Sequence, residues 1–159
     1  MPAANGSAAS VNDEHLDLGR LGDFIGFRLR RIQNQLSSAF AAQSVDLGLR
    51  PGEFSALAII SANPGLSQAK LAREVGLDKS AAVTVVDDLE RLGYAERRRS
   101  PNDRRRHALY TRRAGEAALE QMFTSLKLVE QDVLNALGTR DKQVLSELLD
   151  RLYDSCFRK

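Results

Sequence analysis

The sequence feature that most restricts the fold is a pair of short helical segments joined by a three-residue turn that begins at Gly76. The segments cover 68–75 and 79–92, and each follows a residue, Ser67 or Asp78, whose side-chain oxygen can cap a helix. Glycine suits the turn because it readily adopts the left-handed backbone conformation that ends helices. Two short capped helices at this spacing predict a helix-turn-helix.

Two short strand-like segments, 94–99 and 105–111, follow the predicted helix-turn-helix. The residues 100–103 between them are turn formers, so the segments are expected to form a two-stranded hairpin, or wing. Eight arginines and one aspartate give 97–113 a charge of +7, whereas the whole chain carries only +2. Positive charge is therefore concentrated on the wing, as expected of a surface that approaches nucleic acid.

Four further helices are predicted around this unit, because apolar residues recur there at intervals of three or four. A long helix runs from Leu18 to about Gln43, and a second begins at Pro51. After the wing, a long helix is expected to end at Gly138, and Thr139 to cap a last one. The expected fold is mainly α with a small β-hairpin wing.

The length of the chain allows one compact unit rather than two independent cores. Residues 1–12 are predicted to be a disordered tail and 13–159 a single unit, within which 50–112 form the winged helix DNA-binding region. The apolar stripes of 13–45 and 113–159 have no sheet of their own to cover, so a second copy is the simplest cover. We therefore expect these terminal segments to be dimerisation helices of a homodimer.

Several classes of protein are disfavoured by composition. No apolar stretch approaches the roughly 20 residues that cross a bilayer, and the beginning of the chain lacks the pattern of a secretory signal. The single cysteine, Cys156, cannot form an internal disulfide, which favours a cytoplasmic location. The two histidines, His15 and His107, are accompanied by no phosphate-binding loop or nucleophile motif. We expect no membrane association, no catalysis, no cofactor and no metal.

DNA binding needs phosphate neutralisation for affinity and base contacts for sequence choice. The wing supplies guanidinium groups, which suit the narrow minor groove. The helix from Lys79 offers short side chains that suit the major groove, although Asp87 and Asp88 repel phosphate and are expected to point away from the DNA backbone. The residues predicted to bind DNA are Lys79, Ser80, Val83, Thr84, Arg97, Arg104, Arg105 and Arg106.

Several motifs together resemble the MarR family of bacterial winged helix-turn-helix regulators, over nearly all of 18–157. They are Leu66-Ser67-Gln68-Ala69-Lys70-Leu71-Ala72, Leu77-Asp78-Lys79-Ser80, Asp87-Asp88-Leu89-Glu90-Arg91-Leu92-Gly93-Tyr94, Arg97-Arg98, and Asp103-Arg104-Arg105 with Gly115.

This resemblance implies a dimer built from the first and last helices that represses genes at a palindromic operator in double-stranded DNA and is released by a small aromatic ligand. It also implies that Arg105 enters the minor groove and that Asp103 braces the wing tip. The chain departs from the family pattern at Arg50 and Arg112, which replace the usual Ser or Thr and cannot accept a capping bond. Those two helix starts are expected to be less rigid.

A ligand site is expected on the first helix, where two aromatic and two basic residues share a stripe. Phe24, Phe27, Arg28 and Arg31 would suit an aromatic acid or an aromatic acyl-CoA, although long basic side chains on a helix are commonly plain surface groups.

Two other functions remain open. One is a redox-responsive regulator that acts through Cys156, for which burial as a small apolar residue is the plainer interpretation. The other is a winged-helix module that binds protein, which the arginine-rich wing disfavours.

Overall fold

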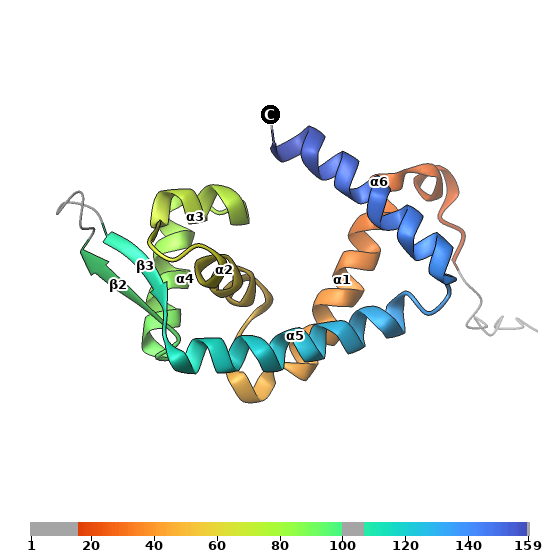
Figure 1. Ribbon diagram of the computed structural model, residues 1–159. Helices are drawn as coiled ribbons and strands as arrows, with labels where there is room; N and C mark the ends of the chain where they lie inside the picture. The colour runs from red at the N-terminus through yellow and green to blue at the C-terminus, as the bar shows by residue number, and fades with distance from the viewer. Residues whose placement is uncertain (1–15, 100–106, 159) are drawn as a thin grey trace, which may run out of the picture. The chain divides into compact units, whose positions relative to one another are not determined.

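The computed structural model describes residues 16–99 and 107–158 and is mainly helical with one small sheet (Figure 1). Two compact units, 1–33 and 34–159, divide the chain, and each is described by itself. The elements are a 3-10 helix Gly19–Asp23, α1 Ile25–Gln43, a 3-10 helix Val45–Leu47, α2 Pro51–Ala62, β1 Leu66–Ser67, α3 Gln68–Val75, α4 Lys79–Arg91, β2 Ala95–Arg99, β3 His107–Thr111, α5 Arg113–Val133 and α6 Thr139–Phe157. The predicted fold class, mainly α with a β-hairpin wing, is confirmed.

The sheet has the strand order β1-β3-β2, with both neighbouring pairs antiparallel. Leu109 in β3 is central, because it lies opposite Leu66 on one side and Arg97 on the other. The sequence analysis missed β1, since a strand of two residues shows no alternation to detect. Because β1 directly precedes α3 and pairs with β3, it holds the start of α3 next to the wing.

The core of the second unit lies between the sheet and the helices α2 to α5. Its fully buried side chains come from each of these elements, so the helix-turn-helix and the wing share one hydrophobic interior. The largest of them are Leu57, Ile60, Leu71, Leu89, Leu109 and Met122.

The turn between α3 and α4 is built as the sequence predicts. Ser67 Oγ accepts a hydrogen bond from the backbone N–H of Lys70 at 3.3 Å, and Asp78 Oδ1 accepts one from Ala81 at 2.8 Å. Gly76 has φ +68°, a left-handed conformation that a side chain would strain. Both N-caps and the glycine end of α3 are confirmed.

The helix starts at Arg50 and Arg112 carry no side-chain cap, yet both are held in other ways. The buried carboxylate of Glu53 accepts hydrogen bonds from the backbone N–H of Arg50 at 2.9 Å and from its Nε at 2.7 Å. The backbone N–H of Arg112 donates to the carbonyl of Tyr94 at 2.8 Å. The expected looseness is therefore countered at α2 by the hydrogen bond that the backbone N–H of Arg50 donates to Glu53, and at α5 by the bond that Arg112 donates to Tyr94.

Gly115 explains why α5 lies so close to the start of the hairpin. A Cβ at this position would stand 2.2 Å from the carbonyl oxygen of Tyr94. No side chain fits that space, so the glycine fixes the approach of α5 to the wing.

Three predicted helix limits were wrong. The first helix begins at Ile25 rather than Leu18, because Gly19 adopts φ +52° and a 3-10 helix precedes it. α5 ends at Val133, ahead of Gly138, in a turn closed by the backbone bond from Leu137 to the carbonyl of Leu134 at 3.0 Å. Thr139 is the first residue of α6 and supplies no cap.

α6 differs from the other long helices because none of its described residues is buried. Leu148, Leu152 and Phe157 are 48%, 54% and 71% exposed. Within the first unit, Leu21 and Leu29 are exposed in the same way. The expectation that Cys156 is buried was wrong for the single chain, because it too is exposed on α6.

Candidate nucleic-acid interface

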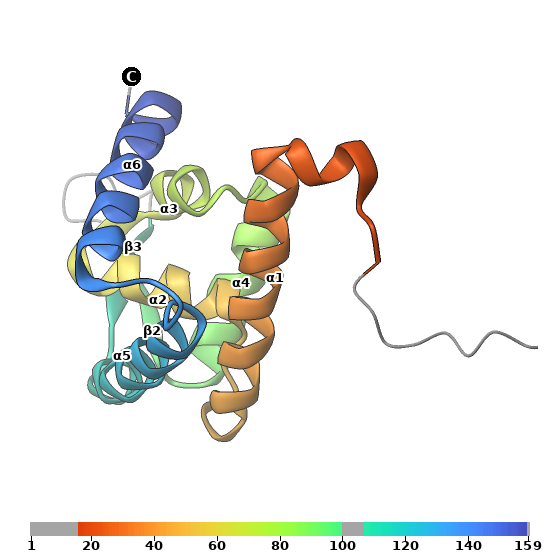
Figure 2. The ribbon, with the colours of Figure 1, turned by 90° about the vertical axis from the view of Figure 1, so that its right-hand side faces the viewer.

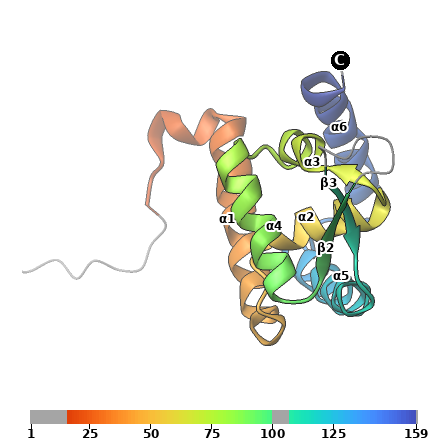
Figure 3. The ribbon, with the colours of Figure 1, turned by 90° about the vertical axis from the view of Figure 1, so that its left-hand side faces the viewer.

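α4 presents one face to the core and the other to solvent. Ala82, Val86 and Leu89 are buried on the inner face. Four residues of the outer face, all predicted to bind DNA, are exposed, namely Lys79, Ser80, Val83 and Thr84. Figure 3 shows α4 beside the hairpin strand β2, with which it is in contact. The helix and the hairpin therefore lie next to each other in one unit.

Thr84 uses its hydroxyl proton within its own helix. Its Oγ1 donates to the backbone carbonyl of Ser80 at 3.3 Å. The oxygen keeps its acceptor lone pairs, and the residue is exposed. Thr84 can thus accept a hydrogen bond from a base amino group or contact a thymine methyl.

Arg97 lies in a cage of polar groups that joins three elements. Its Nη1 is 2.8 Å from Asp87 Oδ1 and also pairs with Glu90, both on α4. Its Nε and Nη2 donate to Gln68 Oε1 on α3 at 3.3 and 3.2 Å. With a side chain only 19% exposed, Arg97 has the geometry of a brace between the wing and both helices. DNA contact by Arg97 stays a prediction, which this geometry does not favour.

Glu96 neutralises two further arginines at the base of the wing. It pairs with Arg98 and accepts a bond from Arg112 Nε at 3.1 Å. The hydrogen bond from Arg98, with the charges of both arginines, holds the pKa of Glu96 below its ordinary value. Arg98 also lies 4.6 Å over the ring of Tyr110. Among the described residues of the hairpin, Arg99 is exposed and has no acidic partner.

The second carboxylate at the end of α4 is also paired. Asp88 is 2.6 Å from Arg50 Nη2 and 3.2 Å from Arg91 Nη2. The hydrogen bond from Arg91 and the charges of both arginines hold the pKa of Asp88 below its ordinary value. Where this end of α4 points relative to DNA stays a prediction, but its carboxylates act within the protein.

The tip of the wing lies outside the described residues. This applies to four predicted site residues, Asp103, Arg104, Arg105 and Arg106. Their roles stay predictions, which rest on the positive charge of the wing for the arginines and on the family resemblance for Asp103 and for the minor-groove placement of Arg105.

The residues predicted to line a ligand site lie on a solvent-facing surface of their own unit. Phe24 is 62% exposed, and Arg28 and Arg31 are also exposed. Phe27 is partly buried, and the guanidinium of Arg30 lies 5.6 Å from its ring centroid. The ligand site stays a prediction.

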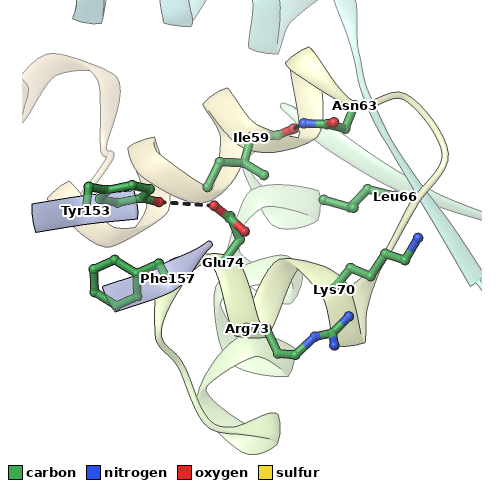
Figure 4. A pocket seen from close by; sticks show the side chains of 8 residues that line it. All are labelled: Ile59, Asn63, Leu66, Lys70, Arg73, Glu74, Tyr153 and Phe157. Carbon is green, nitrogen blue, oxygen red and sulfur yellow. Dashed lines mark hydrogen bonds between the residues drawn. The ribbon is translucent and has the colours of Figure 1, made fainter. Parts of the chain in front are cut away.

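A pocket that the sequence analysis missed lies between α2, α3 and α6 in the second unit (Figure 4). Tyr153 donates its hydroxyl to Glu74 Oε1 at 3.1 Å, and this bond raises the pKa of the phenol. The signal that could have found it is the aromatic pair Tyr153 and Phe157, one helical turn apart. The residues that line the pocket are Ile59, Asn63, Leu66, Lys70, Arg73, Glu74, Tyr153 and Phe157.

Two features of the described residues bear on other functions. Within 16–99 and 107–158, no group of three or more His, Cys, Asp or Glu side chains could hold a metal ion. In the same part of the chain, no helix has the length and apolar character needed to span a bilayer.

Comparison with known proteins identifies relatives over most of the chain. A protein-family model described as the MarR family matches residues 47–106. The "Putative transcriptional regulatory protein for hcr operon" of Thauera aromatica is 36% identical over 149 residues, which cover 93% of this chain and 90% of that protein.

Two solved structures of one repressor, CouR, are also similar. CouR bound to a 23-mer DNA duplex superposes with a TM-score of 0.79 and 30% identity, over 87% of this chain and 99% of that one. CouR from Rhodococcus jostii RHA1 bound to p-coumaroyl-CoA gives a TM-score of 0.76 and 26% identity, over 89% of this chain and 97% of that one.

Proposed function

The chain belongs to the MarR family of DNA-binding transcriptional regulators, and from this premise we propose that it is a homodimeric repressor of a palindromic operator, released by an aromatic acid or an aromatic acyl-CoA. The observation that carries the proposal is the outer face of α4. Lys79, Ser80 and Thr84 are exposed there beside the hairpin, while the acidic side chains of the same helix are held by arginines. The helix can therefore enter a major groove without bringing free carboxylates to the phosphates.

The exposed apolar side chains of α6 support the homodimer. Leu148, Leu149 and Leu152 lie along one helix and are all more than 40% exposed. A soluble chain seldom leaves such a contiguous stripe uncovered, and a second copy buries it by symmetry. Two copies then place two α4 helices in successive major grooves, about one helical turn apart.

The relatives support the class of effector. CouR is a repressor whose solved structures include one with a DNA duplex and one with p-coumaroyl-CoA. An aromatic ligand with a carboxylate or a CoA group would find rings and guanidinium groups on the α1 stripe, which consists of Phe24 just before α1 and of Phe27, Arg28 and Arg31 within it.

Fluorescence anisotropy with labelled DNA from beside the protein's own gene tests DNA binding. We expect affinity to fall steeply with added salt, because released counterions drive phosphate contacts. Binding that salt leaves unchanged, or binding only to a protein partner, would instead support a winged-helix protein-interaction module.

Thr84→Ala tests base reading. We expect altered preference at particular base pairs and little change on random DNA. Thr124→Ala is a matched control, because Thr124 is an exposed α5 threonine whose hydroxyl also donates to its own helix, at 2.9 Å. Arg105→Ala is expected to weaken binding to all sequences alike.

Calorimetry with p-coumarate and p-coumaroyl-CoA, on the intact protein without DNA, tests the effector class. Loss of the heat in Arg28→Gln and Arg31→Gln would support the α1 stripe as its site. Absence of heat with both compounds would contradict the effector class and leave the DNA proposal standing.

A further inference from the structure

One guanidinium group joins the start of α2 to the last turns of the DNA-reading helix α4. We propose that Arg50 is a positioning residue for sequence-specific DNA recognition, which acts by holding Asp88 and so fixes the rotation of α4. The inference deepens the proposed function, on which its DNA part rests. Both helices belong to the second unit and pack against each other (Figure 2).

The guanidinium is anchored on the α2 side by a buried carboxylate. Nε of Arg50 donates to Glu53 Oε1 at 2.7 Å, Nη2 pairs with the same oxygen, and the backbone N–H donates to Oε2 at 2.9 Å. Glu53 is 3% exposed, so its charge depends on Arg50 for compensation. Several charge-assisted bonds to one carboxylate fix the orientation of the guanidinium.

The same guanidinium reaches the C-terminal end of α4. Nη2 of Arg50 lies 2.6 Å from Asp88 Oδ2. The hydroxyl of Tyr94, which follows α4, donates to the backbone carbonyl of Leu47, which precedes α2, at 3.1 Å. The segment before α2 is therefore bonded twice to the end of the reading helix.

Asp88 belongs to the row of side chains that is expected to read bases. Ser80, Thr84 and Asp88 are four residues apart, so they lie along one face of α4. Four helical residues rise about 6 Å, which is the distance along the axis from Thr84 to Asp88. A contact that fixes Asp88 therefore also fixes the direction in which Thr84 projects.

A second ion pair acts on the neighbouring face of α4. Asp87 lies 2.8 Å from Nη1 of Arg97 in the hairpin, and consecutive helical residues project about 100° apart. The inner face of α4 packs through apolar side chains such as Val86 and Leu89, and apolar packing is not directional. The ion pairs on two faces, in contrast, oppose rotation of the helix about its axis.

The balance of charge favours positioning over direct phosphate contact. The cluster at this end of α4 contains two arginines and two carboxylates, namely Arg50, Arg91, Glu53 and Asp88. It is neutral, so it has no surplus positive charge with which to neutralise phosphate. Arg50 stands where the family pattern has Ser or Thr, and a single hydroxyl proton cannot bridge two carboxylates. The bridge is thus a feature of this chain.

Arg50→Ser removes the bridge but keeps a capped helix start. With Glu53 it creates a Ser-x-x-Glu capping box, so circular dichroism should show an unchanged helix content. In fluorescence anisotropy, affinity for DNA from beside the protein's own gene should fall about tenfold, the scale of one charged hydrogen bond. Affinity for a random duplex of equal length and the salt slope should stay unchanged.

Two results with Arg50→Ser would overturn the proposal. Equal losses on both duplexes, with a salt slope reduced by about one, would make Arg50 a phosphate contact. Unchanged affinity for both duplexes would show that recognition does not need the bridge.

Substitutions at the other end of the bridge separate Arg50 from its neighbours. Asp88→Ala leaves Arg50 paired with Glu53 and should give the same tenfold loss, and adding Arg50→Ser should weaken binding no further. Asp88→Glu keeps the carboxylate and should restore most of the affinity. Arg91→Gln is the matched control, because Arg91 pairs with Asp88 from within α4, at 3.2 Å. Additive losses in the double variant, or an equal loss in Arg91→Gln, would contradict the bridge.

Hydrogen exchange of the free protein tests the bridge without DNA. Backbone amides of 84–92 should exchange about tenfold faster in Arg50→Ser and Asp88→Ala than in the wild type, and at the wild-type rate in Arg91→Gln. Equal rates in all four proteins would show that Arg50 does not hold α4. If the wild type does not bind DNA, the proposed function fails, while the exchange rates still decide whether the bridge fixes the helix.

Discussion

The winged-helix region and α6 are both built from helices with apolar stripes, but they use these stripes differently. In the winged-helix region, side chains such as Leu57 and Leu89 are fully buried against the sheet and neighbouring helices. On α6, Leu148 and Leu152 remain about half exposed, and none of the helix's described residues is buried. One region carries its own core, and the other needs a partner surface to bury its apolar side chains.

The comparison teaches that amphipathic spacing alone does not tell where a helix finds its cover. The spacing of apolar residues predicted the helices of the winged-helix region and α6 equally well. The difference arises because strands β1 to β3 and helices α2 to α5 surround one interior, whereas α6 follows the turn after α5 and adds nothing to that interior. Stability of the first region should therefore be intrinsic, and that of the second should depend on protein concentration.

The largest effect is expected from Leu89→Ala, in the core beneath α4. It should lower the free energy of unfolding by about 2–5 kcal/mol, the usual loss for a buried leucine. Denaturant titrations should give the same loss of unfolding free energy at every protein concentration. For Leu152→Ala, the loss of unfolding free energy should instead become smaller on dilution. If the loss were independent of protein concentration in both variants, the comparison would be wrong.

The next effect is expected from Leu152→Glu, which adds a charge to the exposed stripe of α6. We expect dissociation to monomers in sedimentation velocity, with unchanged helix content in circular dichroism. Operator affinity should fall by about 100-fold, because two linked reading helices gain effective concentration. Ser146→Glu, at an exposed polar position of α6, is the control. A variant that stays dimeric would show that α6 is covered elsewhere.

A smaller effect is expected from Arg97→Gln within the winged-helix region. Loss of its bonds to Asp87, Glu90 and Gln68 should cost about 1 kcal/mol of unfolding free energy, given partial exposure. DNA affinity should fall with no change in the salt slope, since a brace touches no phosphate. Arg99→Gln, which removes an arginine that pairs with no acid among the described residues, should reduce that slope by about one. A reduced slope for Arg97→Gln would make it a phosphate contact.

The smallest effect concerns acid. Because Arg91 and Arg50 hold the pKa of Asp88 below its ordinary value, the carboxylate stabilises the winged-helix region above the unfolded pKa. This stabilisation is lost as pH falls through the folded pKa. The melting temperature of the wild type should thus exceed that of Asp88→Asn near neutral pH, and the difference should vanish in acid. A difference in melting temperature that does not depend on pH would mean that the shape of the side chain matters rather than its charge.

The sequence predicted the fold well where local chemistry decides it. Ser67, Asp78 and Gly76 define the helix-turn-helix through caps and a left-handed turn, and these depend only on near neighbours. β1 was missed because its two residues are defined by their partner strand. The limits of the first helix and of α5 were misjudged because apolar spacing continues past the residues that end the helix.

The candidate site was less predictable, because ion pairs join residues far apart in the chain. The number of arginines predicted a uniformly basic wing. In the structure, however, Arg97 forms ion pairs with Asp87 and Glu90, and Arg98 forms one with Glu96. Of these acids, the sequence pointed only to Asp87, and only through its repulsion of phosphate. The pocket was missed for a similar reason, since Glu74 and Tyr153 meet only when α3 and α6 come together.

The tie between Arg97, α3 and α4 has a practical consequence for engineering. Single exchanges at Ser80 or Thr84 leave this joint intact, so altered operator preferences can be explored by point substitution. Grafting an entire α4 from another regulator would remove Asp87 and Glu90 together and free the guanidinium. Chimaeras should therefore exchange α4 and β2 as one cassette, with Gln68 retained.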